Sequence, residues 1–227
     1  RYFKVFKSLR SRNCKKSLRM SLELINLSKV FGSNTIIPEW NIKWGANEKI
    51  GILGTNGSGK STFLKLLAGQ LTPSSGKILI SNKPPEKLPL LASYCSPHLK
   101  LFDKFTVKEH FKYHNLLKPF RNGNSISDIG LSTREFDVPL SSFSSGMKQR
   151  VKLALSIFSE APLLLLDEPC SHLDTKGIEW YQKTLTANTS PTSYFEDRIV
   201  IIASNHVNEE LYDCNSYFLP TGKSVVP

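Results

Sequence analysis

Apolar and polar positions follow two rhythms along this chain, one typical of strands and one typical of helices. Residues 21–27 alternate apolar with polar side chains, which predicts a half-buried strand, and residues 35–44 combine β-branched and aromatic residues with one proline, which favours an edge strand. Apolar runs at 50–53, 90–94, 163–166 and 199–204 predict buried strands, and residues 77–80 predict a short one.

Helical spacing appears between these strands. One helix starts near Lys60 and ends at Gly69, and another follows the N-cap residue Thr106, with Glu109 three residues later. Further helices are expected between Ser144 and Pro162, over 175–185 and, briefly, around 133–136 within the Gly- and Ser-rich stretch 121–142. Strands that alternate with helices predict an α/β fold with a mainly parallel sheet and ligands at the strand C-terminal ends.

The positive charge of the chain is concentrated at its beginning. The formal net charge is +11, but residues 1–19 contain eight Lys or Arg and no acid, so the remainder has 22 basic against 19 acidic residues. We expect Met20 to be the natural start and residues 1–19 to be a basic extension outside the fold. The alternative is a basic amphipathic arm that touches anionic lipid or RNA, because Phe3, Phe6 and Leu9 have helical spacing. Without that arm, no nucleic-acid partner is expected.

Composition excludes two other classes of protein. No apolar run approaches the ~20 residues that a membrane-spanning helix needs. The cysteines, Cys14, Cys95, Cys170 and Cys214, are scattered without metal-ligand spacing, as in a reduced, cytosolic protein.

His110 and His114 are four residues apart on a predicted helix and could bind a metal, but no third ligand is evident, so an exposed helix face is favoured.

The most informative stretch runs from the strand at 50–53 into the helix that starts near Lys60. It fits the phosphate-loop pattern G-x-x-x-x-G-K-[ST] in the strand-to-helix context that the motif requires. Glycines let successive N–H groups surround an anion, and the helix N-terminus adds positive charge. We expect Lys60 to reach the terminal phosphates and Ser61 to bind Mg²⁺. The predicted nucleotide-binding residues are Gly54, Thr55, Asn56, Gly57, Ser58, Gly59, Lys60, Ser61 and Thr62.

Two acids end the apolar run at 163–166. Asp167 is suited to hold Mg²⁺, directly or through water, and Glu168 is suited to orient and deprotonate the attacking water. The alternative is a solvated acidic turn. Because a buried strand precedes them and a phosphate loop lies upstream, we favour the catalytic interpretation.

With these motifs the chain resembles the ATP-binding cassette ATPases, the nucleotide-binding subunits of ABC transporters, over about residues 20–210. The family's LSGGQ signature resembles residues 143–147, in which Ser145 and Met147 depart from the pattern, and its SALD loop resembles residues 171–174. The resemblance implies a phosphate-loop core with a mainly parallel sheet, an N-terminal antiparallel β part and a small helical subdomain at about 97–160 within a domain of residues 20–227. It assigns further roles to Ser144, Gly146 and Asp174 at the nucleotide, to His206 as the catalytic switch residue and to Phe31 as a platform for adenine, for which a core phenylalanine is the alternative.

The resemblance also implies how such a protein works. Two copies would face each other head to tail, with each ATP between the phosphate loop of one and the signature of the other, and hydrolysis would open the dimer. Pro97 stands where the family usually has a glutamine that senses Mg²⁺, so Ser96, a water or nothing from that loop would take its place.

The leading hypothesis is therefore an ATP-hydrolysing subunit bound to a separately encoded transmembrane permease on the cytosolic face of a membrane, with Mg²⁺ and ATP as cofactors. One alternative is a soluble ABC-type ATPase that acts on a macromolecular assembly. Another is a nucleotide-gated module with weak turnover, which the altered signature and the missing glutamine suggest.

Overall fold

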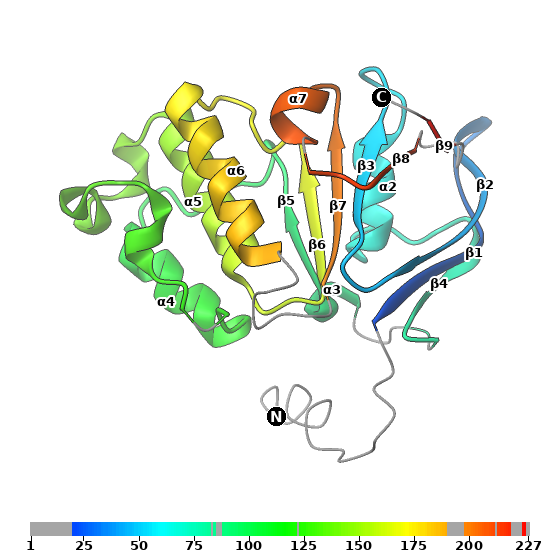
Figure 1. Ribbon diagram of the computed structural model, residues 1–227, viewed down its shortest axis with the longest axis horizontal. Helices are drawn as coiled ribbons and strands as arrows, with labels where there is room; N and C mark the ends of the chain where they lie inside the picture. The colour runs from blue at the N-terminus through cyan, green and yellow to red at the C-terminus, as the bar shows by residue number, and fades with distance from the viewer. Residues whose placement is uncertain are drawn as a thin grey trace, which may run out of the picture.

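The computed structural model describes residues 20–82, 84, 88–121, 123–189, 198–211, 213–218 and 224–225. Residues 1–19, for which we predicted a basic extension, lie outside these ranges. Two sheets form the framework. One is antiparallel, with the order β2-β1-β4, and the other is mainly parallel, with the order β5-β6-β7-β3-β8-β9. Figure 1 shows the antiparallel sheet on one side of the parallel sheet and the helices α4, α5 and α6 on the other.

The antiparallel sheet consists of β1 (Ser21–Phe31), β2 (Asn34–Gly45) and β4 (Ser75–Ile80). The strand β2 lies at the edge of the sheet, as the proline within it predicted. Leu22, Leu24 and Leu27 of β1 are fully buried, whereas the residues between them are partly buried or exposed. The apolar positions of the alternating sequence therefore form the inner face of this sheet.

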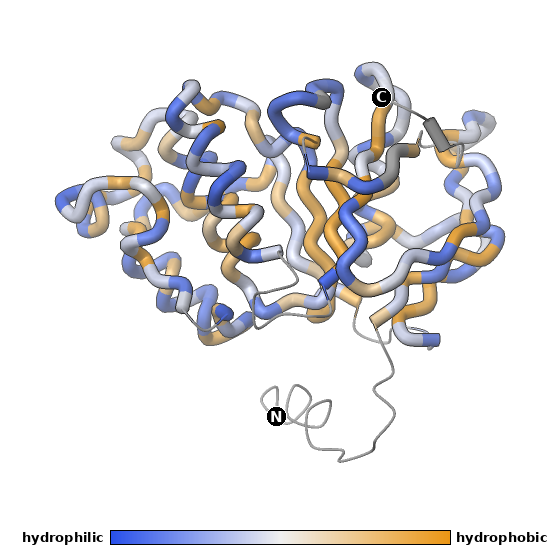
Figure 2. Tube along the Cα trace, in the orientation of Figure 1, coloured by the Kyte–Doolittle hydropathy of each residue, from blue (hydrophilic) through white to orange (hydrophobic). Residues whose placement is uncertain are grey.

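The parallel sheet contains β3 (Lys49–Leu53), β5 (Ala92–Cys95), β6 (Leu163–Asp167), β7 (Ile199–Ser204) and β8 (Ser216–Phe218), and β9 (Ser224–Val225) is antiparallel to β8. Its central strands have no polar face because both faces are covered. Leu163 and Leu165 pack into one core with α2, and Leu164 and Leu166 pack into a second core with α5. The continuous apolar strands in Figure 2 therefore follow from burial on both sides.

The main helices lie where the sequence predicted them. They are α2 (Lys60–Leu67), α4 (Val107–Leu117), α5 (Ser145–Phe158) and α6 (Thr175–Thr189). A single helical turn, α7 (Val207–Glu210), was not predicted. The capping box at the start of α4 is confirmed, since Thr106 accepts from the Glu109 N–H and Glu109 accepts from the Thr106 N–H. Gly69 follows α2 with a φ of 69°, the left-handed conformation of a helix C-terminus.

One expectation about local structure was wrong and another was incomplete. Residues 90–91 belong to a helical turn, α3 (Leu88–Leu91), and the strand begins at Ala92. An apolar run of this length does not distinguish a strand from a buried helical turn. The short helix expected at 133–136 is present as the 3₁₀ helix η2 (Thr133–Asp137). The 3₁₀ helices η1 (Ile126–Ile129) and η3 (Leu140–Ser142) on either side of it were not expected. In η1 and η2, an N-cap serine and an acid three residues later form a capping box, a signal already present in the sequence.

Candidate functional site

Three neighbouring parallel strands bring the predicted motifs together. The strand β7 lies between β3 and β6, with Leu53 opposite Ser204 and Asp167 opposite Ala203. The phosphate loop follows β3, Glu168 follows β6 and Asn205 follows β7, so all three segments leave the same edge of the sheet. This is the edge at which parallel α/β sheets bind their ligands.

The phosphate loop has the backbone of an anion cradle. Gly54, Gly57 and Gly59 have positive φ angles of 152°, 80° and 99°. At Gly59 a Cβ atom would lie 3.0 Å from the side chain of Ile36, so this position needs glycine for space as well as for conformation. The helix α2 begins at the next residue and buries Phe63 and Leu64, which fixes its N-terminus beside the loop.

Lys60 is held inside this loop by three acceptors. Its Nζ donates to the carbonyl oxygens of Gly54 and Thr55 and, at 2.9 Å, to Oδ1 of Asn205. Burial lowers the pKa of Lys60, and the nearby carboxylates of Glu168, Asp167 and Glu210 oppose that shift. The Asn205 amide also donates to Oδ1 of Asn56 at 2.9 Å, so it joins β7 to the phosphate loop.

Asp167 is the buried acid of the site, with 2% of its surface exposed. Its Oδ2 accepts from the hydroxyl of Tyr94 at 3.2 Å, and its Oδ1 is buried without a hydrogen-bond partner among the described residues. Burial raises its pKa, whereas hydrogen bonding with Ser61 and Tyr94 lowers it. A buried carboxylate oxygen without a partner, next to a serine hydroxyl, is a donor set that suits Mg²⁺. The residues present therefore fit this ion.

Glu168 stands on a strained turn. Its φ is +45°, which is uncommon for a residue with a side chain, and its N–H donates to the carbonyl of Ala203 on β7 at 2.8 Å. Such strain persists where the surroundings over-determine the backbone, and it is common at active sites. The turn directs the chain away from the sheet directly after the acidic pair.

The segment that resembles the signature forms the N-terminus of α5. Ser144 is its N-cap, and its side chain accepts from the Met147 N–H at 3.2 Å. Gly146 lies against the chain after the acids, because a Cβ atom there would stand 2.7 Å from the carbonyl oxygen of His172. Asp174 caps α6 through the Gly177 N–H at 2.8 Å and binds Arg150 of α5 at 3.0 Å. Hydrogen bonds from Gly177 and then from Arg150 lower the Asp174 pKa.

The contacts of the other predicted residues described next involve residues outside the phosphate loop. His206 is exposed, and its N–H donates to Oγ of Ser204 at 2.8 Å. Phe31 is about half exposed at the end of β1, with Nζ of Lys29 4.7 Å from its ring centre, so it is not a core phenylalanine. Ser96 is buried, and the carbonyl of Pro97 accepts from Lys152. Their roles at a nucleotide stay predictions.

The expectation for the two histidines of α4 was wrong. His110 is buried and its Nε2–H donates to the Phe102 carbonyl at 3.1 Å, and His114 contacts Oγ of Ser159 at 2.6 Å. They lie on the inner side of α4 because Phe102 and Phe120 stack against their rings. Burial lowers the pKa of His110, and it lowers that of His114 to about 4.

Sequence reasoning missed four residues that contact the predicted site: Tyr94, Gln149, Asn205 and Glu210. Tyr94 stands at the end of one predicted strand and Asn205 directly after the end of another, which is where polar side chains of an α/β site gather. That position was the available signal. Gln149 and Glu210 lie within helices, and their sequence neighbourhood gives no such signal.

Comparison with known proteins agrees with this geometry. Residues 38–171 match the family model described as ABC transporter. The chain belongs to the ABC transporter family. As a member of this family it binds and hydrolyses ATP, and the prediction of an ABC-type α/β fold is confirmed.

Individual relatives of this ABC ATPase differ in how much of their length it spans. It is 28% identical to an uncharacterized ABC transporter ATP-binding protein of Bacillus subtilis, YybJ, covering 86% of this chain and 89% of the relative. It is 36% identical to the spermidine/putrescine import ATP-binding protein PotA of Nitrosomonas europaea, covering 72% and 48%. It is 28% identical to the ribosome protection protein VmlR of B. subtilis, covering 86% and only 36%.

Solved structures show the same fold. A putative ABC transporter ATP-binding protein from Pyrococcus furiosus superposes with a TM-score of 0.75 at 21% identity, covering 90% of this chain and all of the other. A dimeric ATP-binding cassette in a post-hydrolysis state, bound to ADP and Pi, superposes with a TM-score of 0.73 at 19% identity, covering 90% and 97%. Within the described ranges of this ABC ATPase, the helices are too short or too polar to cross a membrane.

Proposed function

We propose that this ABC ATPase is the ATP-hydrolysing subunit of a membrane transporter and that its Glu168 is the catalytic carboxylate. The observation that carries the catalytic assignment is the convergence of the phosphate loop and the acids of β6 on one edge of the parallel sheet. The buried Asp167 and the strained Glu168 have different environments there, which supports different roles for the two carboxylates.

In this proposal the phosphate loop and Lys60 bind the β- and γ-phosphates, and Ser61 and Asp167 hold Mg²⁺, which supplies neutralising charge. Glu168 accepts a proton from water as the water oxygen bonds to the γ-phosphorus. The bond from that phosphorus to the bridging oxygen breaks, which yields ADP and inorganic phosphate. His206 lies past the end of β7, where it would contact the γ-phosphate, and Phe31 would stack on the adenine.

A second copy of the chain would complete the site. Ser144, Gly146 and the N-terminus of α5 from one copy would bind the γ-phosphate held by the other, with Asp174 at the same interface. The exposure of Ser144 and the orientation of α5 by Arg150 and Asp174 support this arrangement. Hydrolysis would remove these contacts and open the dimer.

An apolar surface on the helical side of the protein suits a membrane partner. Phe102 and Leu117 are 70% and 69% exposed. Tyr113 and Leu116, which belong to α4 like Leu117, are exposed as well. Phe102, Tyr113 and Leu117 line a hollow of about 230 Å³ together with Leu155 of α5. Large exposed apolar side chains around a hollow favour docking of an apolar segment. We propose that this surface binds a short cytosolic helix of the transmembrane permease.

The catalytic assignment is tested by Glu168→Gln, which keeps the size of the side chain and removes its basicity. We expect steady-state ATP hydrolysis to fall at least a hundredfold while nucleotide binding persists, because a general base contributes about that much. Glu179→Gln on the exposed part of α6 is the matched control. Hydrolysis by Glu168→Gln at the rate of the unchanged protein would refute the assignment.

The docking surface is tested by coexpression with any multi-helix membrane protein that a neighbouring gene encodes. Leu117→Glu should abolish copurification and leave basal ATP hydrolysis unchanged, whereas Val138→Glu, on an exposed apolar residue outside the hollow, should change neither copurification nor hydrolysis. Undiminished copurification of Leu117→Glu would overturn the docking proposal. The absence of any neighbouring membrane protein would favour the second candidate.

That second candidate is an ATPase that acts on a macromolecular assembly without a permease. The observation in its favour is that the relatives include the ribosome protection protein VmlR of B. subtilis, which this chain matches over 36% of its length. The third candidate, a weakly hydrolysing gate, is favoured by Ser145 and Met147 in the signature. A measurable turnover number for the unchanged protein separates it from the first two.

A further inference from the structure

One peptide unit after the catalytic turn is held at both of its polar atoms. The carbonyl oxygen of Pro169 accepts from the side-chain amide of Gln149 at 2.9 Å. The N–H of Cys170, in the same peptide plane, donates to Oε1 of Glu210 at 2.6 Å. Because a peptide is planar, fixing both atoms fixes its rotation about the chain. Glu168 directly precedes Pro169, the residue that supplies the carbonyl group of this peptide.

The two side chains that hold the peptide come from different parts of the site. Gln149 lies in the second turn of α5, the helix whose N-terminus is the signature, and its side chain is 1% exposed. Glu210 ends the helical turn α7 that follows His206, and its N–H donates to the His206 carbonyl at 3.0 Å. The Pro169–Cys170 peptide therefore links the signature helix and the switch turn to the strained Glu168.

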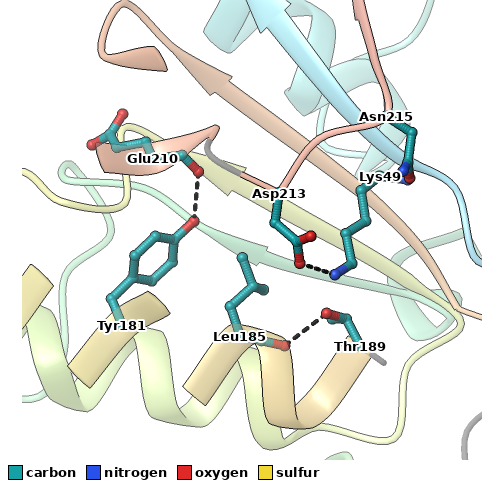
Figure 3. Close-up of polar contacts among 7 residues, drawn as sticks. All are labelled: Lys49, Tyr181, Leu185, Thr189, Glu210, Asp213 and Asn215. Atoms are coloured by element: carbon teal, nitrogen blue, oxygen red, sulfur yellow. Dashed lines mark hydrogen bonds and ion pairs between the residues drawn. The ribbon is translucent and has the colours of Figure 1, made fainter. Parts of the chain in front are cut away.

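Burial of the Glu210 carboxyl group at this position is energetically unfavourable. It is only 2% exposed, and no lysine or arginine within the described ranges forms an ion pair with it. A buried carboxyl without an ion-pair partner costs stability, and such groups cluster at functional sites. The turn that carries it is fixed to α6, because the hydroxyl of Tyr181 donates to the Glu210 carbonyl at 3.2 Å (Figure 3). The backbone of Glu210 is thus tied to α6 by this hydrogen bond.

We propose that Glu210 and Gln149 are positioning residues that clamp the Pro169–Cys170 peptide and thereby set the orientation of Glu168 for attack by water. Neither side chain touches the nucleotide in this proposal. It rests on Glu168 being the catalytic carboxylate. The left-handed φ of Glu168 is the strained state that the clamp maintains, and loss of either hydrogen bond lets the turn relax.

The test is the steady-state kinetics of ATP hydrolysis by the purified full chain. Glu210→Leu and Gln149→Leu should each lower kcat at least tenfold and change the KM for ATP less than twofold, because the phosphate loop is untouched. Glu210→Gln keeps an acceptor for the Cys170 N–H and should therefore retain kcat within about threefold of the unchanged protein. Glu209→Gln, on the exposed side of α7, is the control.

Glu210→Asp guards against a leucine variant that does not fold. It keeps the charge but shortens the side chain, so kcat should fall as in the leucine variant. Wild-type kcat in Glu210→Asp or Gln149→Leu, or an equal loss of kcat in Glu210→Gln and Glu210→Leu, would overturn the clamp. If Glu168→Gln is inactive and these variants are active, the clamp alone fails. If Glu168→Gln hydrolyses ATP normally, the catalytic assignment fails and the clamp falls with it.

Discussion

Lys60 and Asn205 are 145 residues apart in the sequence, and the Nζ atom of the lysine donates to the amide oxygen of the asparagine at 2.9 Å. The same amide donates to Asn56, so one side chain at the end of β7 joins both ends of the phosphate loop to the centre of the parallel sheet. The cationic group that the sequence predicts for phosphate binding is therefore oriented by a residue outside its own motif.

We expect Asn205→Ala to weaken ATP binding about fivefold, because Lys60 loses a hydrogen bond worth about 1 kcal/mol. Asn56 loses its partner in the same variant. Titration with a fluorescent ATP analogue measures this effect, and Asn208→Ala, on an exposed residue of α7, is the control. Equal dissociation constants for Asn205→Ala and the unchanged protein would contradict the orienting role of the amide.

Tyr94 offers a test of the Mg²⁺ site. Its hydroxyl donates to Oδ2 of Asp167, so Tyr94→Phe removes one partner of this carboxylate and leaves the ring in place. We expect the Mg²⁺ concentration for half-maximal hydrolysis to rise about fivefold, the equivalent of one hydrogen bond, because Asp167 is less firmly oriented. Mg²⁺ titration of ATP hydrolysis gives the value. Tyr113→Phe on the exposed face of α4 should not move it, and an unchanged midpoint in Tyr94→Phe would refute the link.

The signature glycine should be sensitive to a single methyl group. In Gly146→Ala the new Cβ would stand 2.7 Å from the His172 carbonyl oxygen, a backbone atom that cannot rotate away. We expect a loss of about 1–3 kcal/mol in the free energy of unfolding, typical of overpacking. Urea denaturation measures it. Ser145→Ala, one residue earlier and exposed, should change stability by less than about 0.5 kcal/mol.

Burial raises the pKa of Glu210 to about 7, from an ordinary value of 4.5. Hydrogen bonding from Ser204 and Cys170 and the charge of His206 lower it, and the charge of Glu168 raises it further. The folded state therefore holds this proton more tightly than the unfolded state does. The stability that it contributes is present below about pH 4.5 and is lost as the pH rises through about 7.

Glu210→Gln removes this dependence. The free energy of unfolding of the variant, relative to that of the unchanged protein, should therefore increase by up to ~3 kcal/mol as the pH rises from about 4.5 to above 7. Denaturant unfolding of both proteins across this range measures the difference. A constant difference between the two proteins would show that Glu210 does not titrate there.

Much of the site could be predicted because its residues are close together in the sequence. The phosphate loop is a continuous segment, and backbone geometry alone makes it a cradle once a strand and a helix flank it. Asp167 and Glu168 follow directly from a run of four leucines that only a doubly covered strand can bury. The capping box of α4 was equally local. Their roles in chemistry stay predictions.

Local patterns failed where distant contacts decided the outcome. His110 and His114 have the polar character of an exposed helix face, but the rings of Phe102 and Phe120 cover them. Leu90 and Leu91 continue an apolar run, but the strand starts after them because β5 pairs with β6 only from Ala92. The division of the chain into a core and a helical subdomain at 97–160 remains a prediction.

The sequence by itself determined the succession of the main strands and helices along the chain, the cradle and the two acids, because each depends on spacing within one segment. Only the tertiary structure decided which side chains support them. Asn205 contacts Lys60, Tyr94 contacts Asp167, and Glu210 contacts Cys170 across separations of 145, 73 and 40 residues. The physical reason is that parallel strands from distant parts of the chain end at one edge of the sheet, and the order of those strands is fixed by packing on both faces, which no local pattern records.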